Sequence, residues 1–190
     1  MELLKKRILE DASVYEGNVL KVDSFLNHQL DVGLLDAMGK EFKKRFSDVP
    51  VTKILTVEAS GISLACMTAV YFNVPVIFAK KSNALNMEED TYNSKAYSYT
   101  RSAEYIMKVS KRYIDNNDSV LIIDDFLANG EAAMGLIEIA RQAGAKVVGI
   151  GDAIEKGFQK GGNMLREKGF KVESLVIVKS MENGNIIFEE

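Results

Sequence analysis

The sequence has little of several features that mark whole classes of protein. It has one cysteine, Cys66, which excludes an intrachain disulfide framework and indicates a reducing compartment. Its one histidine, His28, cannot form a histidine metal cluster. The 2 prolines argue against long disordered linkers. No apolar run approaches the roughly 18 residues that span a bilayer, and the N-terminal stretch is too charged for a signal peptide, so we expect a cytoplasmic protein.

An excess of positive charge is also missing. Lys and Arg total 24, Asp and Glu total 27, and the formal net charge is −3. This near-balance argues against a dedicated DNA-binding or membrane-surface protein. At 190 residues, 47% of them hydrophobic, the chain fits a single compact domain spanning 1–190.

What the sequence does contain is an alternation of short apolar runs and amphipathic stretches. We predict strands at residues 53–57, 76–79, 119–123, 147–150 and 175–178. We predict helices at residues 31–46, 62–72 and 131–142. Continuous apolar strands separated by helices are typical of a parallel sheet covered on both faces, which right-handed crossovers build into an α/β fold. On the second of these helices, the apolar neighbours of Cys66 predict a buried, inert thiol.

Residues 82–105 break this pattern, because they are polar and rich in Ser, Asn, Thr and Tyr. Such an insertion is either a functional lid or a disordered loop. Within and just beyond it, residues 95–109 can form an antiparallel hairpin that turns near Arg101 and Ser102.

The stretch 119–133 carries the clearest chemistry. An apolar strand leads into Asp124 and Asp125, a short loop contains Asn129 and Gly130, and a helix follows. A helix N-terminus suits a phosphate, and Gly130 lets the phosphate approach the backbone. The two carboxylates suit sugar hydroxyls, a Mg²⁺ ion or a developing positive charge, so the pattern points to a sugar phosphate. The alternative is that aspartate ends the strand only because it turns and caps well.

Residues 120–130 resemble the phosphoribosyl pyrophosphate (PRPP) signature of the type I phosphoribosyltransferases. That family usually has Thr or Ser at the place of Asn129 and often Thr at the place of Ala132. The run Asp-Asp-Phe-Leu-Ala-Asn-Gly at 124–130 is more specifically similar to the bacterial branch that acts on xanthine. Residues 19–29 and 150–158 resemble the same branch, so the resemblance covers nearly the whole chain.

The resemblance implies a central parallel sheet flanked by helices, with a hood from about residues 1–30 and the C-terminal part, and a flexible lid at about 82–105. It implies that Asp124 and Asp125 are catalytic and help indirectly to hold Mg²⁺. The residues that would bind PRPP are Ala128, Asn129, Gly130, Glu131, Ala132, Ser60, Gly61 and Lys81. Without the resemblance, Ser60 reads as an ordinary helix cap and Lys81 as a solvated lysine.

The resemblance also implies a base site formed by Leu20, Asn27 and Lys156, with the partners xanthine and PRPP and a homodimer. A cation and amide donors suit the carbonyls of an oxidised purine, and Phe158 or Phe25 could stack on its ring. The expected reaction transfers the phosphoribosyl group to N9 of xanthine. Two alternatives remain open at this point, namely a transferase for guanine, hypoxanthine or adenine, and a non-catalytic regulator that binds PRPP.

Overall fold

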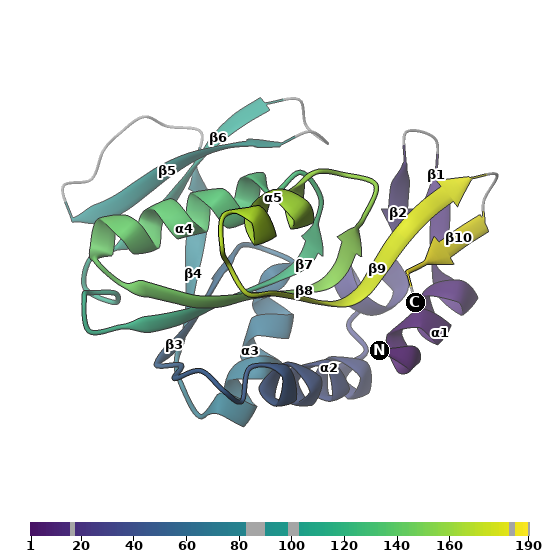
Figure 1. The fold of residues 1–190 in the computed structure, drawn as a ribbon, viewed down its shortest axis with the longest axis horizontal. Helices are drawn as coiled ribbons and strands as arrows, with labels where there is room; N and C mark the ends of the chain where they lie inside the picture. The colour runs from purple at the N-terminus through teal and green to yellow at the C-terminus, as the bar shows by residue number, and fades with distance from the viewer. Residues whose placement is uncertain (16–17, 83–89, 99–102, 183–184, 190) are drawn as a thin grey trace.

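The computed structural model describes residues 1–15, 18–82, 90–98, 103–182 and 185–189. Its centre is an eight-stranded sheet with helices on both faces (Figure 1), in the strand order β10-β9-β8-β7-β3-β4-β6-β5. The strands are β3 (Lys53–Val57), β4 (Val76–Ser82), β5 (Thr91–Ser98), β6 (Ala103–Ser110), β7 (Ser119–Leu127), β8 (Lys146–Lys156), β9 (Val172–Glu182) and β10 (Asn185–Phe188).

The five middle strands of this sheet, β9-β8-β7-β3-β4, are parallel, which confirms the predicted parallel core. The sheet is not parallel throughout, because β10 and the β5–β6 pair run antiparallel at its two edges. The physical reason is connection length. Strands joined by a short turn pair antiparallel, whereas parallel neighbours need a crossover such as a helix.

Helices cover both faces of the sheet (Figure 1). On one face lie α2 (Val32–Arg45) and α3 (Gly61–Phe72), and on the other lie α4 (Glu131–Ala143) and α5 (Gly161–Glu167). The bounds of the three predicted helices are confirmed to within one or two residues. Helix α5 was not predicted. Asp31 caps α2 by accepting a hydrogen bond from the Leu34 N–H at 3.0 Å.

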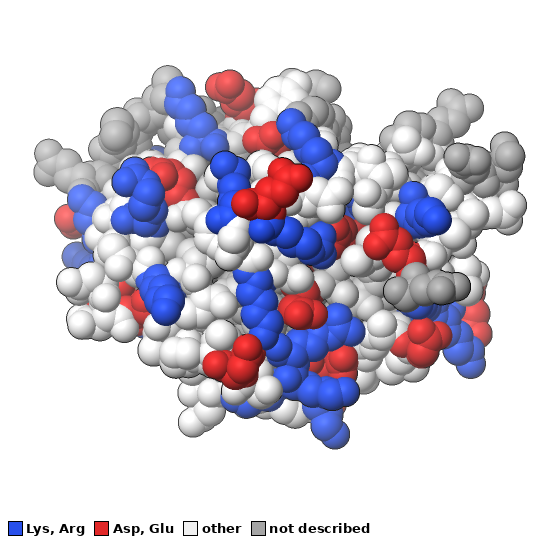
Figure 2. All heavy atoms as spheres, viewed as in Figure 1, with Lys and Arg blue, Asp and Glu red and all other residues white. Residues whose placement is uncertain are grey.

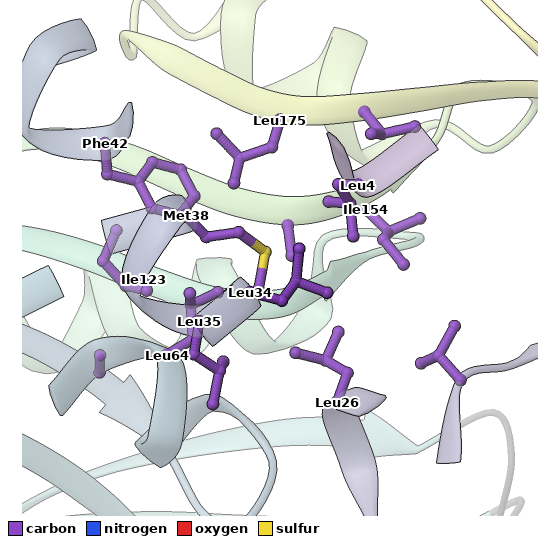
Figure 3. Close-up of a cluster of buried hydrophobic side chains, with 14 of the residues drawn as sticks. Leu4, Leu26, Leu34, Leu35, Met38, Phe42, Leu64, Ile123, Ile154 and Leu175 are labelled. Atoms are coloured by element: carbon purple, nitrogen blue, oxygen red, sulfur yellow. The ribbon is translucent and has the colours of Figure 1, made fainter. Parts of the chain in front are cut away.

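The larger of two buried apolar clusters lies between α2, α3, the N-terminal residues and the sheet (Figure 3). Two glycines on β8 make the close packing of α2 possible. A Cβ at Gly151 would lie 2.7 Å from Phe42 Cε1, and a Cβ at Gly149 would press against the ring of Phe46. The second cluster packs α4 against the opposite face and includes Ile122, Leu136 and Ile139.

The N-terminal region forms α1 (Glu2–Asp11), the hairpin strands β1 (Ser13–Tyr15) and β2 (Val19–Lys21), and a π-helix at Asp23–Asn27. These elements, together with β10, gather at the β9 end of the sheet (Figure 1). The α-amino group of Met1 donates to the Leu175 carbonyl at 2.5 Å, which ties α1 to β9.

The polar segment 82–105 contributes most of the antiparallel pair at the other edge of the sheet. The predicted hairpin is present, since β5 pairs with β6 from Thr91↔Ser110 to Ser98↔Ala103. It begins earlier than predicted, and the Gln142 side chain on α4 donates to the Asn93 carbonyl at 2.8 Å. The predicted turn at residues 101–102 and the stretch 83–89 lie outside the described residues.

Two features of the surface bear on the earlier expectations. Basic and acidic side chains are interspersed over the face shown in Figure 2. Cys66 is exposed, so the prediction of a buried thiol is wrong. Across the described parts of the chain, no helix combines the length and the apolar character needed to cross a bilayer.

Candidate active site

The two adjacent aspartates lie inside β7, which continues to Leu127 and is therefore longer than predicted. Asp124 and Asp125 are each only 8% exposed. The Asp125 N–H donates to Oδ1 of Asp124 at 3.0 Å. The strand thus delivers two carboxyl groups to the carboxyl end of the sheet, which is where open α/β sheets bind ligands.

The loop after β7 ends at Gly130, which caps α4 with a φ of 83°. That left-handed conformation favours glycine. The first hydrogen bond within α4 runs from the Met134 N–H to the Gly130 carbonyl at 2.9 Å. The N–H groups that precede Met134 are therefore not used by the helix, which gives the loop the donors that an anion needs.

A cavity of about 410 Å³ opens over this loop. The loop 128–132 and Asp124 line one part of it, and Lys156 lines another. The other lining residues are Phe126, Leu127 and Ala133, which flank the loop, together with Asn18, Val19, Lys81, Tyr97, Tyr105, Asp152 and Gln159 from elsewhere in the chain. Residues far apart in the sequence therefore meet at one end of the sheet.

The floor of the cavity is strongly acidic. Burial, reinforced by the neighbouring charges of Asp125 and Asp152, raises the pKa of Asp124 well above its ordinary value. Burial together with Glu155 and Asp125 does the same to the pKa of Asp152. Asp152 is 1% exposed, and its Oδ2 has no hydrogen-bond partner among the described residues. A ligand that brings positive charge or hydroxyl donors would relieve this repulsion.

The turn that opens α3 lies directly beside the acidic floor. A Cβ at Gly61 would lie 2.6 Å from Asp124 Oδ1 and against Oγ1 of Thr56, so only glycine fits there. Ser60 occupies the cap position without a capping hydrogen bond from its side chain. The peptide bond between Glu58 and Ala59 is cis. The Ser60–Gly61 turn and Asp124 are therefore neighbours in space.

Lys81 reaches the cavity from the end of β4. Its N–H donates to Glu58 Oε1 at 2.6 Å, which links it to the turn before α3. Its ammonium lies 5.2 Å from the centre of the Tyr105 ring. Tyr105 and Tyr97, from the β5–β6 hairpin, line the same cavity.

Lys156, the last residue of β8, also lines the cavity. Its ammonium donates to the Asn18 carbonyl at 2.9 Å and lies 5.8 Å from the centre of the Phe126 ring. Burial lowers the pKa of Lys156. A cation beside an apolar ring, under the N-terminal hairpin, suits a flat polar ring with exocyclic oxygens.

No model of a protein family matches the chain. It is 61% identical over 189 residues to the xanthine phosphoribosyltransferase of Clostridium novyi, and the match covers 100% of both chains. It is 60% identical over 190 residues to the one from Ruminiclostridium cellulolyticum, again over 100% of both. The chain belongs to the xanthine phosphoribosyltransferase family.

Solved structures give the same fold. The adenine phosphoribosyltransferase of Trypanosoma brucei aligns with a TM-score of 0.76 at 23% identity, over 92% of this chain and 79% of that one. The one from Giardia lamblia also gives 0.76 at 23% identity, over 93% and 98%. These likenesses confirm the predicted fold, and membership of the xanthine phosphoribosyltransferase family makes the protein an enzyme, which removes the alternative of a non-catalytic regulator.

Four residues expected at the base site of a xanthine phosphoribosyltransferase do not line the cavity. The Leu20 side chain is 6% exposed and packs in the larger core cluster, although its neighbours Asn18 and Val19 do line the cavity. Asn27 is exposed at the end of the π-helix. Phe25 is fully buried in the core, so the idea that it stacks on a base is wrong. Phe158 is 38% exposed and lies outside the lining, whereas Phe126 lies within it.

The residues of this xanthine phosphoribosyltransferase site fit a magnesium ion only with help from a ligand. No cluster of three or more metal-ligating side chains occurs in the described ranges. Asp124 and Asp125 offer hard oxygens in a cluster with excess negative charge. Magnesium is commonly held by one or two carboxylates together with substrate phosphates, so this donor set is sufficient.

Proposed function

We propose that the chain transfers the 5-phosphoribosyl group of PRPP to N9 of xanthine, yielding xanthosine 5′-monophosphate (XMP) and pyrophosphate in purine salvage. The observation that carries this proposal is a single cavity with a helix N-terminal loop, buried carboxylates and Lys156 around it. Those groups complement a phosphate, a cationic sugar and an oxidised purine. The names of the relatives support xanthine as the base.

The loop 128–132 binds the 5′-phosphate in this proposal. Its donors are the backbone N–H groups ahead of Met134, so the role does not depend on a hydroxyl at Asn129 or Ala132. The left-handed Gly130 turns the loop into α4 and so aims these groups at one place. The partial positive charge of the α4 N-terminus adds to the attraction.

Asp124 and Asp125 act on the ribose. N9 of xanthine gives up its proton to water and forms its bond to C1′, while the bond from C1′ to the pyrophosphate oxygen breaks and its electron pair leaves with pyrophosphate. Positive charge then develops on the ribose ring. Carboxylates already fixed in place beside that charge stabilise the transition state more than the ground state, which lowers the barrier. The same groups accept hydrogen bonds from the ribose hydroxyls.

The turn at Ser60 and Gly61 and the ammonium of Lys81 hold the pyrophosphate in this scheme. The closeness of Gly61 to Asp124 supports this, because the leaving group must start beside the anomeric carbon. Magnesium, held indirectly by Asp124 and Asp125, would neutralise part of the pyrophosphate charge. Lys81 supplies a further cation in the lining of the cavity.

The base lies between Lys156 and Phe126. The ammonium meets a carbonyl of xanthine, and the phenyl ring gives the base an apolar wall. Adenine has no carbonyl at C6, so the lysine favours an oxidised purine. We retain Leu20 and Asn27 as base contacts on the resemblance alone, as parts of a hood at about residues 1–30.

Two larger-scale features also belong to the proposal. The segment 82–105 acts as a lid that keeps water from PRPP, with Tyr97 at the cavity wall as its support. The working unit is a homodimer, which light scattering at assay concentration tests. A monomer peak under those conditions would contradict it.

The decisive test mixes PRPP and magnesium with xanthine, guanine, hypoxanthine or adenine and follows nucleotide formation. We expect XMP to form with the highest kcat/KM. Efficient turnover of adenine with none of xanthine would overturn the base assignment. No nucleotide from any base would overturn the transfer reaction itself.

A further inference from the structure

A half-buried ion pair lies near the phosphate loop, outside the cavity lining. Arg166 on α5 donates two parallel hydrogen bonds to Glu155, each of 2.7 Å. The Glu155 side chain is 4% exposed, and its second oxygen also accepts from the Ser174 hydroxyl. Burial alone would raise the pKa of Glu155, but the bonds from Arg166 and Ser174 outweigh it and lower that pKa. The pair therefore fixes α5 to the ends of β8 and β9.

The first residue of α5 touches the phosphate loop. The Gly161 N–H donates to the Ala128 carbonyl at 3.0 Å. A Cβ at Gly161 would lie against that carbonyl and 2.6 Å from the Gly130 nitrogen. The next glycine, Gly162, packs so closely on the Glu155 carboxylate that no side chain fits between them. The backbone of α5 thus touches both the loop and the ion pair.

The seven residues of α5 are too few to hold a helix in place by themselves. Its position depends on tertiary contacts, chiefly the buried Leu165 and the fork of Arg166 on Glu155. Burial of the Leu165 side chain stabilises the position of α5 but does not fix its orientation. The planar, two-bond fork sets the orientation of the helix, and with it the place of Gly161 behind the loop.

We infer that Arg166, acting through Glu155 and Gly161, is a positioning residue that holds the loop 128–132 in the shape that binds the 5′-phosphate. This inference rests on the proposed function in one respect, namely that the loop takes a phosphate. It assigns a role in ligand affinity to a residue that lines no part of the cavity.

The test compares the binding of XMP with that of xanthosine, which lacks the phosphate, by titration calorimetry on wild type and Arg166→Met. Arg166→Met should lower the affinity for XMP by roughly 10-fold or more, since small misplacements at a site have effects of that size. Its affinity for xanthosine should change by less than about threefold. In turnover assays the KM for PRPP should rise with a smaller change in kcat.

The matched control is Arg141→Met. Arg141 on α4 makes the same fork to Glu138, with two bonds of 2.7 Å, on an exposed face. Its XMP affinity should equal that of wild type. If Arg166→Met loses XMP and xanthosine affinity in equal proportion, or loses neither, the positioning role is overturned. If wild type itself binds both ligands equally, the phosphate assignment of the proposed function fails instead.

Removing Arg166 alone leaves a buried carboxylate without its partner, which can unfold the protein. The double variant Glu155→Gln/Arg166→Met removes that charge together with the fork. It should fold and still show the selective loss of XMP affinity. A folded double variant with wild-type XMP affinity overturns the inference.

Discussion

The proposed phosphate end and the proposed base end of the cavity are built in different ways. One contiguous stretch, residues 119–133, supplies the strand, both carboxylates, the loop and the helix of the phosphate end. The base end is assembled from Asn18 and Val19, Phe126, and Lys156. The first comes from one local stretch, whose loop is contacted by Gly161 of α5, whereas the second exists only when residues 18–19 and Lys156 pack beside Phe126.

This difference predicts how the two ends respond to change. Alterations at the phosphate end should affect every base alike, because PRPP is common to all the reactions. Alterations at the base end should change which purine is used and leave PRPP binding nearly intact. The following variants test that separation.

The largest effect is expected for Asp125→Asn. The amide keeps the shape of the side chain but removes charge from beside the ribose, so kcat/KM should fall about 10²–10³-fold with every purine. Initial rates with xanthine and guanine measure this, with thermal unfolding as the check on folding. Asp115→Asn, an exposed position ahead of the same strand, is the control. Wild-type turnover by Asp125→Asn would show that the carboxylate is dispensable.

The next largest effect is expected for Lys156→Met, at the base end. Methionine fills similar space without the cation, so the KM for xanthine should rise roughly 10-fold or more as a buried charge-assisted hydrogen bond is lost. The KM for PRPP should change by less than about twofold. Lys146→Met, an exposed position at the start of the same strand, should behave as wild type. Equal rises in both KM values would mean that the two ends are not separate.

Gly130→Ala tests the phosphate end by backbone geometry. At a φ of 83° alanine is strained by about 1–2 kcal/mol, and its Cβ would lie 2.8 Å from Met164 Cε. The loop should shift, and the KM for PRPP should rise about 10-fold. Gly144→Ala, at the other end of α4 with a φ of 73°, carries the same strain far from the loop. It should lose stability but keep the wild-type KM, so a similar rise in both variants would contradict a local effect.

The same contrast explains what could be predicted from the sequence. The strand, the Asp124–Asp125 pair and the Gly130 turn were predictable because they are adjacent in the chain and follow local rules. Phe126 was not predicted to line the cavity, because the sequence pattern pointed to the aspartates before it and to the loop after it. Asp152 was not predicted as a site residue. A single aspartate in an apolar strand gives no local indication that it pairs with Asp124 on the neighbouring strand.

Two wrong predictions have equally physical causes. The α3 sequence is apolar on nearly all sides, so its periodicity could not show that Cys66 faces outward. Phe25 was predicted as one of two rings that could stack on the base, but the π-helix turns Phe25 and Leu26 into the core. Both errors concern the direction of a side chain, which packing decides.

The smallest expected effect is a change in the free energy of unfolding when Asp152, which lines the cavity, is substituted. Its pKa is raised in the folded protein by burial and by neighbouring acids, so folding favours its protonated form. Stability is therefore lost as the pH rises from the unfolded-state pKa through the folded-state pKa. Asp152→Asn cannot ionise, so it should gain about 1 kcal/mol of unfolding free energy near pH 7, and the gain should shrink as the pH approaches 4.

Asp118, which directly precedes β7, should change stability with pH in the opposite direction. Burial would raise its pKa, but the bonds from Lys53, the Asp115 N–H and Thr52 outweigh it, so the pKa is lowered. Its contribution to stability is therefore present above the unfolded-state pKa and is lost as the pH falls through the folded-state pKa. Asp118→Asn should destabilise the protein near pH 7, and less so in acid. Urea unfolding of both variants at about pH 3, 5 and 8 measures this, because the change for Asp118 falls below its unfolded-state pKa and the change for Asp152 falls above it. If both substitutions changed the free energy of unfolding in the same direction, the pKa of Asp152 would not be raised in the folded protein. The acidic residues of the cavity would then not favour the binding of positive charge.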